Sequence, residues 1–86
     1  MNITIKKPTA AEIKSMQDKP IWSCEVSKFD WHYDETEVCL VLEGEVEVTT
    51  ATEKVKFGAG DLVTFPKGLD CVWDVKKTIK KHYIFL

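Results

Sequence analysis

The stretch Gly60–Gly68 constrains the fold more than any other part of the chain. It reads Gly-Asp-Leu-Val-Thr-Phe-Pro-Lys-Gly, a short apolar run between two turns. Gly60 can adopt the positive φ that most residues avoid, and the Asp61 side chain can hydrogen-bond to the backbone two residues further on. Pro66 fixes its own φ and favours an extended conformation for Phe65. The stretch therefore predicts a buried strand with a defined start and end.

Short runs of alternating apolar and polar residues, separated by turns, follow one another along the chain. They indicate about nine short strands, which is typical of an all-β sandwich or barrel. Near the N-terminus, Thr9 and Glu12 instead match a capping box, and Met16 follows at helical spacing. The sequence thus predicts one short helix at about residues 9–17 and barrel strands from about 21 to 86.

Two further turns are expected within this pattern. Residues 38–42 are apolar on both faces and end at Glu43-Gly44, after which a half-exposed strand begins. Residues 76–81 include four lysines, Lys81 among them. We interpret this segment as a solvated turn that precedes a terminal strand at 82–86.

The chain is short, so its core is small. Its 86 residues make one domain, residues 1–86, and a domain of this size buries only about 60–65% of its unfolded surface. We expect a homodimer to add stability. A strand that is apolar on both faces must be covered on both, on the outer side by a second layer or by a second subunit. The outward face of Val38, Leu40 and Leu42 is the expected contact of a dimer.

Charge and cysteine content narrow the partners and the compartment. The net charge is −2, so we expect neither nucleic-acid nor membrane binding. Cys24, Cys39 and Cys71 are odd in number and widely spaced, which excludes a fully paired disulfide framework and indicates a reducing compartment. No apolar run approaches membrane-spanning length, and the N-terminus has no signal-peptide core. We therefore expect a cytoplasmic protein.

Five residues stand at the spacing of two known motifs. Glu37 and Gly44 fit Glu-x6-Gly, whereas Gly60, Pro66 and Gly68 fit Gly-x5-Pro-x-Gly. The two patterns in this order resemble the motifs of the cupin superfamily, also called RmlC-like. The resemblance implies an all-β cupin fold, a double-stranded β-helix of jelly-roll type, here with one short N-terminal helix.

The resemblance also locates the positions at which metal-binding cupins carry histidines. In those members, three histidines and the motif glutamate hold a divalent metal inside the barrel. This chain has Cys71 at the third histidine position. The first two positions fall on Trp31 and Tyr33 or on Asp30 and His32, depending on the gap before the glutamate.

Strand parity decides between the two registers. Phe29, Trp31 and Tyr33 share one face, and burying each of these side chains is favoured by roughly 2 kcal/mol or more. Turning Asp30 and His32 inward would expose that aromatic face, because a one-residue slip flips every side chain. We therefore expect Trp31 and Tyr33 to point inward and His32 outward, with neither a metal nor another cofactor in the barrel.

Further segments narrow the resemblance to one branch. They are residues 29–33, 42–48 and 60–69, the run Cys71-x-Trp73-x-Val75, and Lys81-His82-Tyr83. The chain resembles the small single-domain cupins related to the barrel of ureidoglycine aminohydrolase and to the ethanolamine-utilisation cupin. The resemblance to the aminohydrolase implies a manganese-dependent release of ammonia from a ureido compound.

An inward aromatic stripe around one carboxylate predicts a ligand pocket. We expect it to bind a small polar or cationic molecule without a catalytic metal. The predicted lining is Trp31, Tyr33, Glu37, Cys71, Trp73 and His82. Glu37 is the candidate general acid or base, and Cys71 is a candidate nucleophile, with an inert core role as its alternative.

Two other functions stay open. One is a metal-dependent hydrolase or isomerase that acts on a small ureido or amine metabolite. Its divalent metal, such as manganese or zinc, would be held by His32, Glu37, Cys71 and His82. The other is a structural module whose main role is dimerisation. The sequence does not decide whether the domain catalyses a reaction.

Overall fold

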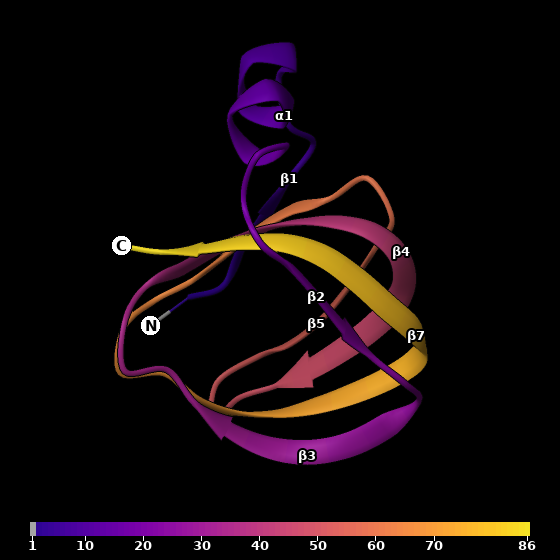
Figure 1. The fold of residues 1–86 in the computed structure, drawn as a ribbon. Coiled ribbons are helices and arrows are strands. Elements are labelled where there is room, and N and C mark those ends of the chain that lie inside the picture. Colours follow the sequence, from indigo (N-terminus) through magenta and orange to yellow (C-terminus); the bar gives the residue numbers. More distant parts are fainter. Residues whose placement is uncertain (1) are drawn as a thin grey trace.

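Two long strands, β4 (Glu37–Thr49) and β7 (Asp70–Phe85), form the frame of the fold. A computed structural model describes residues 2–86. The two strands pair antiparallel, from Glu37 opposite Phe85 to Thr49 opposite Val72, and both bend back across the molecule (Figure 1). Each of them therefore belongs to two layers of sheet.

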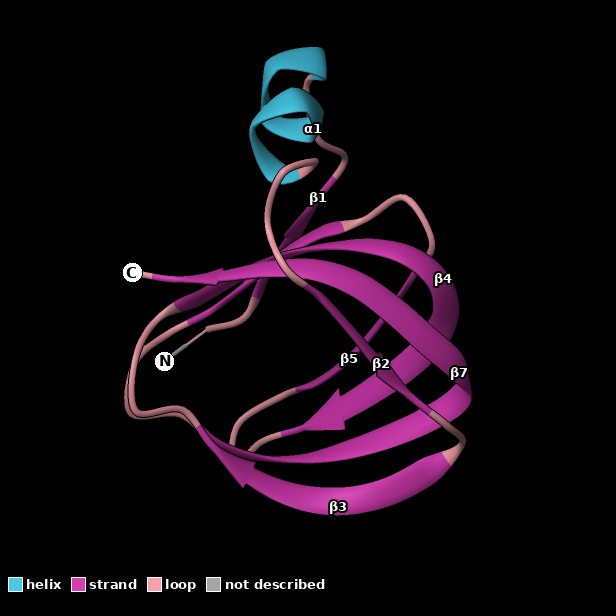
Figure 2. Cartoon of the chain, in the orientation of Figure 1, coloured by secondary structure: helices cyan, strands magenta, loops and turns pink. Residues whose placement is uncertain are grey.

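The shorter strands pair with one half or the other of this frame (Figure 2). One layer has the order β1–β6–β4–β7–β2. The second layer places β5 beside the C-terminal half of β4 and β3 beside the N-terminal half of β7. The bounds are β1 (Thr4–Lys6), β2 (Ile21–Cys24), β3 (Ser27–His32), β5 (Lys54–Gly58) and β6 (Leu62–Phe65).

Residues 2–86 form seven strands, fewer than the nine expected, because two predicted turns are bends inside long strands. Gly44 marks one bend. Its φ is 104°, and an added Cβ would lie 2.5 Å from the Thr78 carbonyl oxygen. Glycine therefore allows β4 to approach β7 closely where the register between them shifts. The turn predicted at residues 76–81 is also wrong, since this segment is part of β7.

The strand predicted between two turns is β6. The turn glycines at its ends have positive φ, 91° at Gly60 and 87° at Gly68. Asp61 differs from the expectation in one detail, because its carboxylate accepts a hydrogen bond from the Gly58 amide at 2.9 Å. The Gly68 amide donates to the Tyr33 carbonyl oxygen at 2.7 Å. The second turn thereby fixes the backbone at Tyr33.

Helix α1 (Ala10–Met16) begins with the predicted capping box. The Thr9 hydroxyl accepts from the Glu12 amide at 3.2 Å, and the Glu12 carboxylate accepts from the Thr9 amide at 2.8 Å. The helix lies outside the barrel (Figure 1), where Met16 packs with Leu40 and Leu62 on the outer face of the first layer. Within residues 2–86, no helix has the length and apolar character needed to cross a membrane.

This helix covers much of the face at which we expected a second subunit. Leu40 is buried, and Val38 is half-buried against the same cluster, whereas Leu42 is partly exposed. Of the two kinds of cover expected for this face, a second layer or a second subunit, helix α1 of the same chain supplies the first. The homodimer itself stays a prediction.

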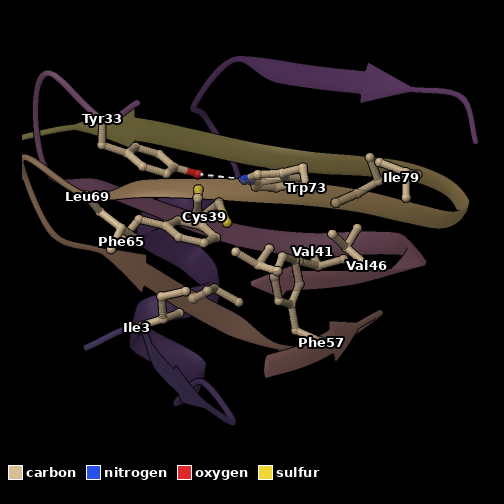
Figure 3. Packing of buried hydrophobic residues seen from close by; sticks show 14 residues of the cluster. Ile3, Tyr33, Cys39, Val41, Val46, Phe57, Phe65, Leu69, Trp73 and Ile79 are labelled. Carbon is tan, nitrogen blue, oxygen red and sulfur yellow. Dashed lines mark hydrogen bonds between the residues drawn. The ribbon is translucent and has the colours of Figure 1, made fainter. Parts of the chain in front are cut away.

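The main core lies between the two layers of sheet (Figure 3). Tyr33 stacks on Phe65 with ring centroids 4.8 Å apart, and Phe65 in turn contacts Trp73 at 5.6 Å. Some of these aromatic side chains, Tyr33 and Trp73, belong both to the core and to the wall of a cavity.

Candidate ligand-binding site

A cavity of about 270 Å³ lies between the two layers, beside β2 and β3. Strands β2 and β3 contribute Trp22, Phe29 and Trp31 to its wall, and β7 contributes Trp73, Tyr83 and Phe85. Tyr33 completes the aromatic part, and Glu37 and Lys81 are also part of the lining. The cavity therefore combines apolar walls with one pair of opposite charges.

Trp31 lies at the mouth of this cavity. Its side chain is on the same side of β3 as the cavity, as strand parity predicts, but 49% of its surface is exposed. The expectation of a buried Trp31 is wrong because β3 lies at the margin of the second layer, paired with β7 along its length. Tyr33 is buried below it, with the two rings edge to face at 6.4 Å. Trp31 therefore forms part of the lining at the side of the cavity that is open to solvent.

Glu37 and Lys81 form a buried ion pair in the cavity. The Lys81 ammonium donates to Glu37 Oε2 at 2.5 Å, and the two side chains are only 5–6% exposed. Lys81 lies opposite Val41 of β4, so its long side chain extends along the inner face to reach the start of that strand. The ammonium is also 5.0 Å from the Trp22 ring centroid and 4.8 Å from that of Trp73.

Sequence reasoning missed Lys81, which we had placed in a solvated turn. The structure instead places Lys81 inside a continuous strand, where it shares the inward face with Tyr83 and Phe85. The alternation from Ile79 through residues 81, 83 and 85 was the signal that could have identified it. The lysine-rich composition concealed this signal, since lysines are rarely buried without a partner.

The same alternation corrects the prediction for His82. Its neighbours Lys81 and Tyr83 take the inward positions, so His82 faces the outer side, where its Nδ1 lies 2.9 Å from the Lys19 carbonyl oxygen. His82 is therefore not part of the cavity lining. His32 also points outward, as expected, with Nδ1 2.7 Å from the Asp70 carboxylate.

Tyr33 presents a neutral phenol to the cavity. The Trp73 indole N–H donates to the Tyr33 hydroxyl oxygen at 3.2 Å (Figure 3). Burial, together with the nearby Glu37 carboxylate, raises the pKa of the Tyr33 phenol well above its ordinary value. The phenol therefore keeps its proton at neutral pH, and its O–H can donate a hydrogen bond.

The cysteines near the cavity are protonated thiols. Burial, with a smaller contribution from Asp70, raises the pKa of the Cys71 thiol to about 11. Burial likewise raises the pKa of the Cys39 thiol to about 12. Cys71 lies outside the lining of the cavity, so the prediction that it lines the pocket is wrong. Its surroundings correspond to the inert core alternative, because the thiol and not the reactive thiolate is favoured there.

The four residues of the alternative metal site do not come together. His32 and His82 lie outside the barrel, whereas Glu37 is inside and paired with Lys81. Across residues 2–86, no group of three or more His, Cys, Asp or Glu side chains is placed to hold a metal ion. The expected ligand set of His32, Glu37, Cys71 and His82 is therefore wrong as a set.

Comparison with known families agrees with this architecture. A family model described as the EutQ-like cupin domain matches residues 12–83. This chain belongs to the EutQ-like cupin family. The all-β cupin fold expected from the two motifs is thereby confirmed. No curated protein matches the cupin.

Solved structures place the cupin among proteins of similar fold. It is 49% identical to a DUF861 family protein from Thermotoga maritima, with a TM-score of 0.94 and coverage of 99% of this chain and 100% of that one. The Clostridium difficile EutQ protein is 24% identical, with a TM-score of 0.67 over 73% of this chain and 50% of its own. A putative ethanolamine utilization protein from Salmonella typhimurium is 22% identical, with a TM-score of 0.70 over 96% and 68% of the two chains. At these lower identities the likeness shows the fold alone.

Proposed function

We propose that this cupin binds a small organic molecule in its aromatic cavity, without a catalytic metal. The observation that carries the proposal is the Glu37–Lys81 pair, buried in a cavity wall between tryptophan rings. A buried ion pair contributes little net stability compared with apolar residues of the same volume, because both charges lose their hydration. Its position on the lining of a cavity therefore favours a role in recognising a ligand.

The residues present do not fit a divalent metal at this site. The motif glutamate faces the Lys81 ammonium, and a positive charge beside Glu37 disfavours a second one. Protonated Cys71 is a poor ligand, since metals bind the thiolate. The metal-dependent hydrolase, and the manganese-dependent reaction implied by the resemblance to ureidoglycine aminohydrolase, therefore have less support than ligand binding.

The tryptophans provide a direct test. All three, Trp22, Trp31 and Trp73, line the cavity, so their indole N–H signals in proton–nitrogen NMR report on its occupancy. A fragment library should yield molecules that shift the three signals together. A library that shifts none of them contradicts the proposal. Elemental analysis of protein purified without chelator tests the proposal that the cavity holds no catalytic metal. A metal that is present in a 1:1 ratio to the protein and is lost in Glu37→Gln would contradict it.

A matched pair of variants tests the role of Glu37. Glu37→Gln should weaken the binding of fragments that donate a hydrogen bond to Glu37 by about tenfold or more, because a charge-assisted hydrogen bond is lost. Glu43→Gln is the control, since Glu43 is on the same strand and exposed. Equal affinities of the two variants for the same fragments would contradict a role of Glu37 in binding.

A further inference from the structure

The cation-binding position of the cavity is filled by the protein itself. The Lys81 ammonium lies about equally close to the Trp22 and Trp73 rings, at 5.0 and 4.8 Å from their centroids. The two rings stand edge to face, 82° apart, and Glu37 supplies the anion. Aromatic rings and a carboxylate in this arrangement are what proteins use to bind an external ammonium group. Here the chain's own lysine occupies that place.

This arrangement sets the charge that a ligand can carry. The pair adds one positive and one negative charge to the lining, so the cavity is neutral overall. A cationic ligand would meet the Lys81 ammonium at close range, and an anionic ligand would meet the Glu37 carboxylate. Either ligand would also lose its hydration among aromatic walls without a free counter-charge. An uncharged ligand avoids both costs, so of the polar or cationic ligands expected from the sequence this arrangement favours an uncharged polar one.

The polar groups that remain free set the hydrogen bonds a ligand can make. Lys81 occupies one acceptor site of Glu37, at Oε2. A carboxylate has about four such sites, and Glu37 is part of the cavity lining, so a further site can accept a hydrogen bond from a ligand. The Lys81 ammonium has N–H groups beyond the one that Glu37 uses, and the Tyr33 phenol keeps its proton. An acceptor thus lies beside donors.

We propose that the ligand is an uncharged, planar molecule with a hydrogen-bond donor next to an acceptor, such as a primary amide or a lactam on an aromatic or other apolar body. The donor would bind Glu37, the acceptor would bind Lys81 or Tyr33, and the flat body would lie against the tryptophan rings. The size is suitable, because the cavity of about 270 Å³ exceeds the roughly 150 Å³ that holds a benzene molecule. This inference rests on the proposed function and specifies its ligand class.

Three probes of one shape and different charge test the inference. Benzamide is neutral with a donor beside an acceptor, benzoate is an anion, and benzylamine is a cation at neutral pH. Titrations followed by the indole signals of Trp22 and Trp73 should show benzamide binding at least about tenfold more tightly than either charged probe. Equal or weaker binding of benzamide, or no binding, overturns the ligand class. The proposed function stands in that case if other fragments still shift the signals, and it fails with the ligand class if none does.

Variants that remove one charge of the pair should change the preference for a neutral ligand: one variant should favour a cationic probe and the other an anionic probe. Lys81→Met vacates the aromatic cage and leaves Glu37 unpaired, so benzylamine should gain about tenfold or more relative to the other probes. Glu37→Gln leaves the ammonium unpaired, so benzoate should gain instead. The double variant Glu37→Gln/Lys81→Met has no unpaired charge, should be more stable than either single variant, and is the control in which neither charged probe gains. The inference is overturned if the single variants fold and keep the original order of affinities. If a single variant does not fold, the double variant provides the test. Tighter binding of benzylamine or benzoate to the double variant than to the unchanged protein also overturns the inference.

Discussion

At the residue scale, removing only one partner of the Glu37–Lys81 pair should destabilise the fold. Both side chains are almost fully buried, so a single substitution leaves an uncompensated charge among aromatic rings. Glu37→Gln or Lys81→Met should each lower the free energy of unfolding by about 3 kcal/mol. Glu37→Gln/Lys81→Met should cost less than either single change. Urea unfolding of the unchanged protein, the two single variants and the double variant gives a double-mutant cycle. If the losses in the free energy of unfolding of the single variants simply add up in the double variant, the two groups are not coupled.

Cys71 makes a separate prediction about reactivity. Its raised pKa, about 11, means that the thiolate fraction is far smaller at pH 7–8 than for an ordinary cysteine and rises only towards that pKa. Iodoacetamide at pH 8 should therefore leave Cys71 of the folded protein unmodified. Mass spectrometry after proteolysis locates the modified residues, and the same treatment in urea, where all three cysteines should react, is the control. Rapid labelling of Cys71 at neutral pH would restore it as a candidate nucleophile.

At the scale of single elements, Gly44 controls the bend of β4. An alanine there would need a positive φ and would place its Cβ against the Thr78 carbonyl oxygen. Gly44→Ala should therefore lower the free energy of unfolding by more than about 2 kcal/mol. Gly60→Ala is the matched control, because Gly60 also has a positive φ but has no atom within 4 Å of an added Cβ. It should cost only about 1–2 kcal/mol. Equal costs would show that the contact at Gly44 is unimportant.

Helix α1 stabilises the barrel through one buried side chain. Met16 is 4% exposed and covers Leu40, whereas Ile13 of the same helix is 37% exposed. Met16→Ala should lower the free energy of unfolding by about 2–4 kcal/mol. Ile13→Ala should lower the free energy of unfolding clearly less than Met16→Ala does. Thermal unfolding of the two variants measures the difference. Gel filtration of Met16→Ala also tests whether the uncovered outer face then associates between molecules.

Particular residues explain which elements the sequence could predict. Local signals were sufficient where they alone determine the structure, as at the capping box of Thr9 and at the turn glycines that bound β6. They were insufficient at Gly44, because a bend inside a long strand depends on the partner strand. At Lys81 the lysine-rich composition concealed the alternation that places this residue inward. Glu37 was placed inward by parity, but its partner lies 44 residues away in sequence, and no local pattern connects the two.

At the scale of the whole molecule, both layers of sheet share the same two strands. The core residues Val41 and Val48 of β4 belong to different halves of that strand, yet they lie in one buried cluster. Neither layer can separate from the other without breaking β4 and β7. The cavity lies between the layers, so the geometry of its lining depends on the whole barrel and not on one loop.

Unfolding should therefore be a single cooperative transition. Tryptophan fluorescence reports on the cavity, because Trp22, Trp31 and Trp73 all line it, while far-UV circular dichroism reports on the strands as a whole. In urea, the two signals should change with the same midpoint and the same dependence on denaturant. A fragment that binds the cavity should shift both midpoints upward together, since binding to the native state stabilises the entire domain. Fluorescence that changes at lower urea than circular dichroism would show that the cavity opens independently, and the two layers would then not form one cooperative unit.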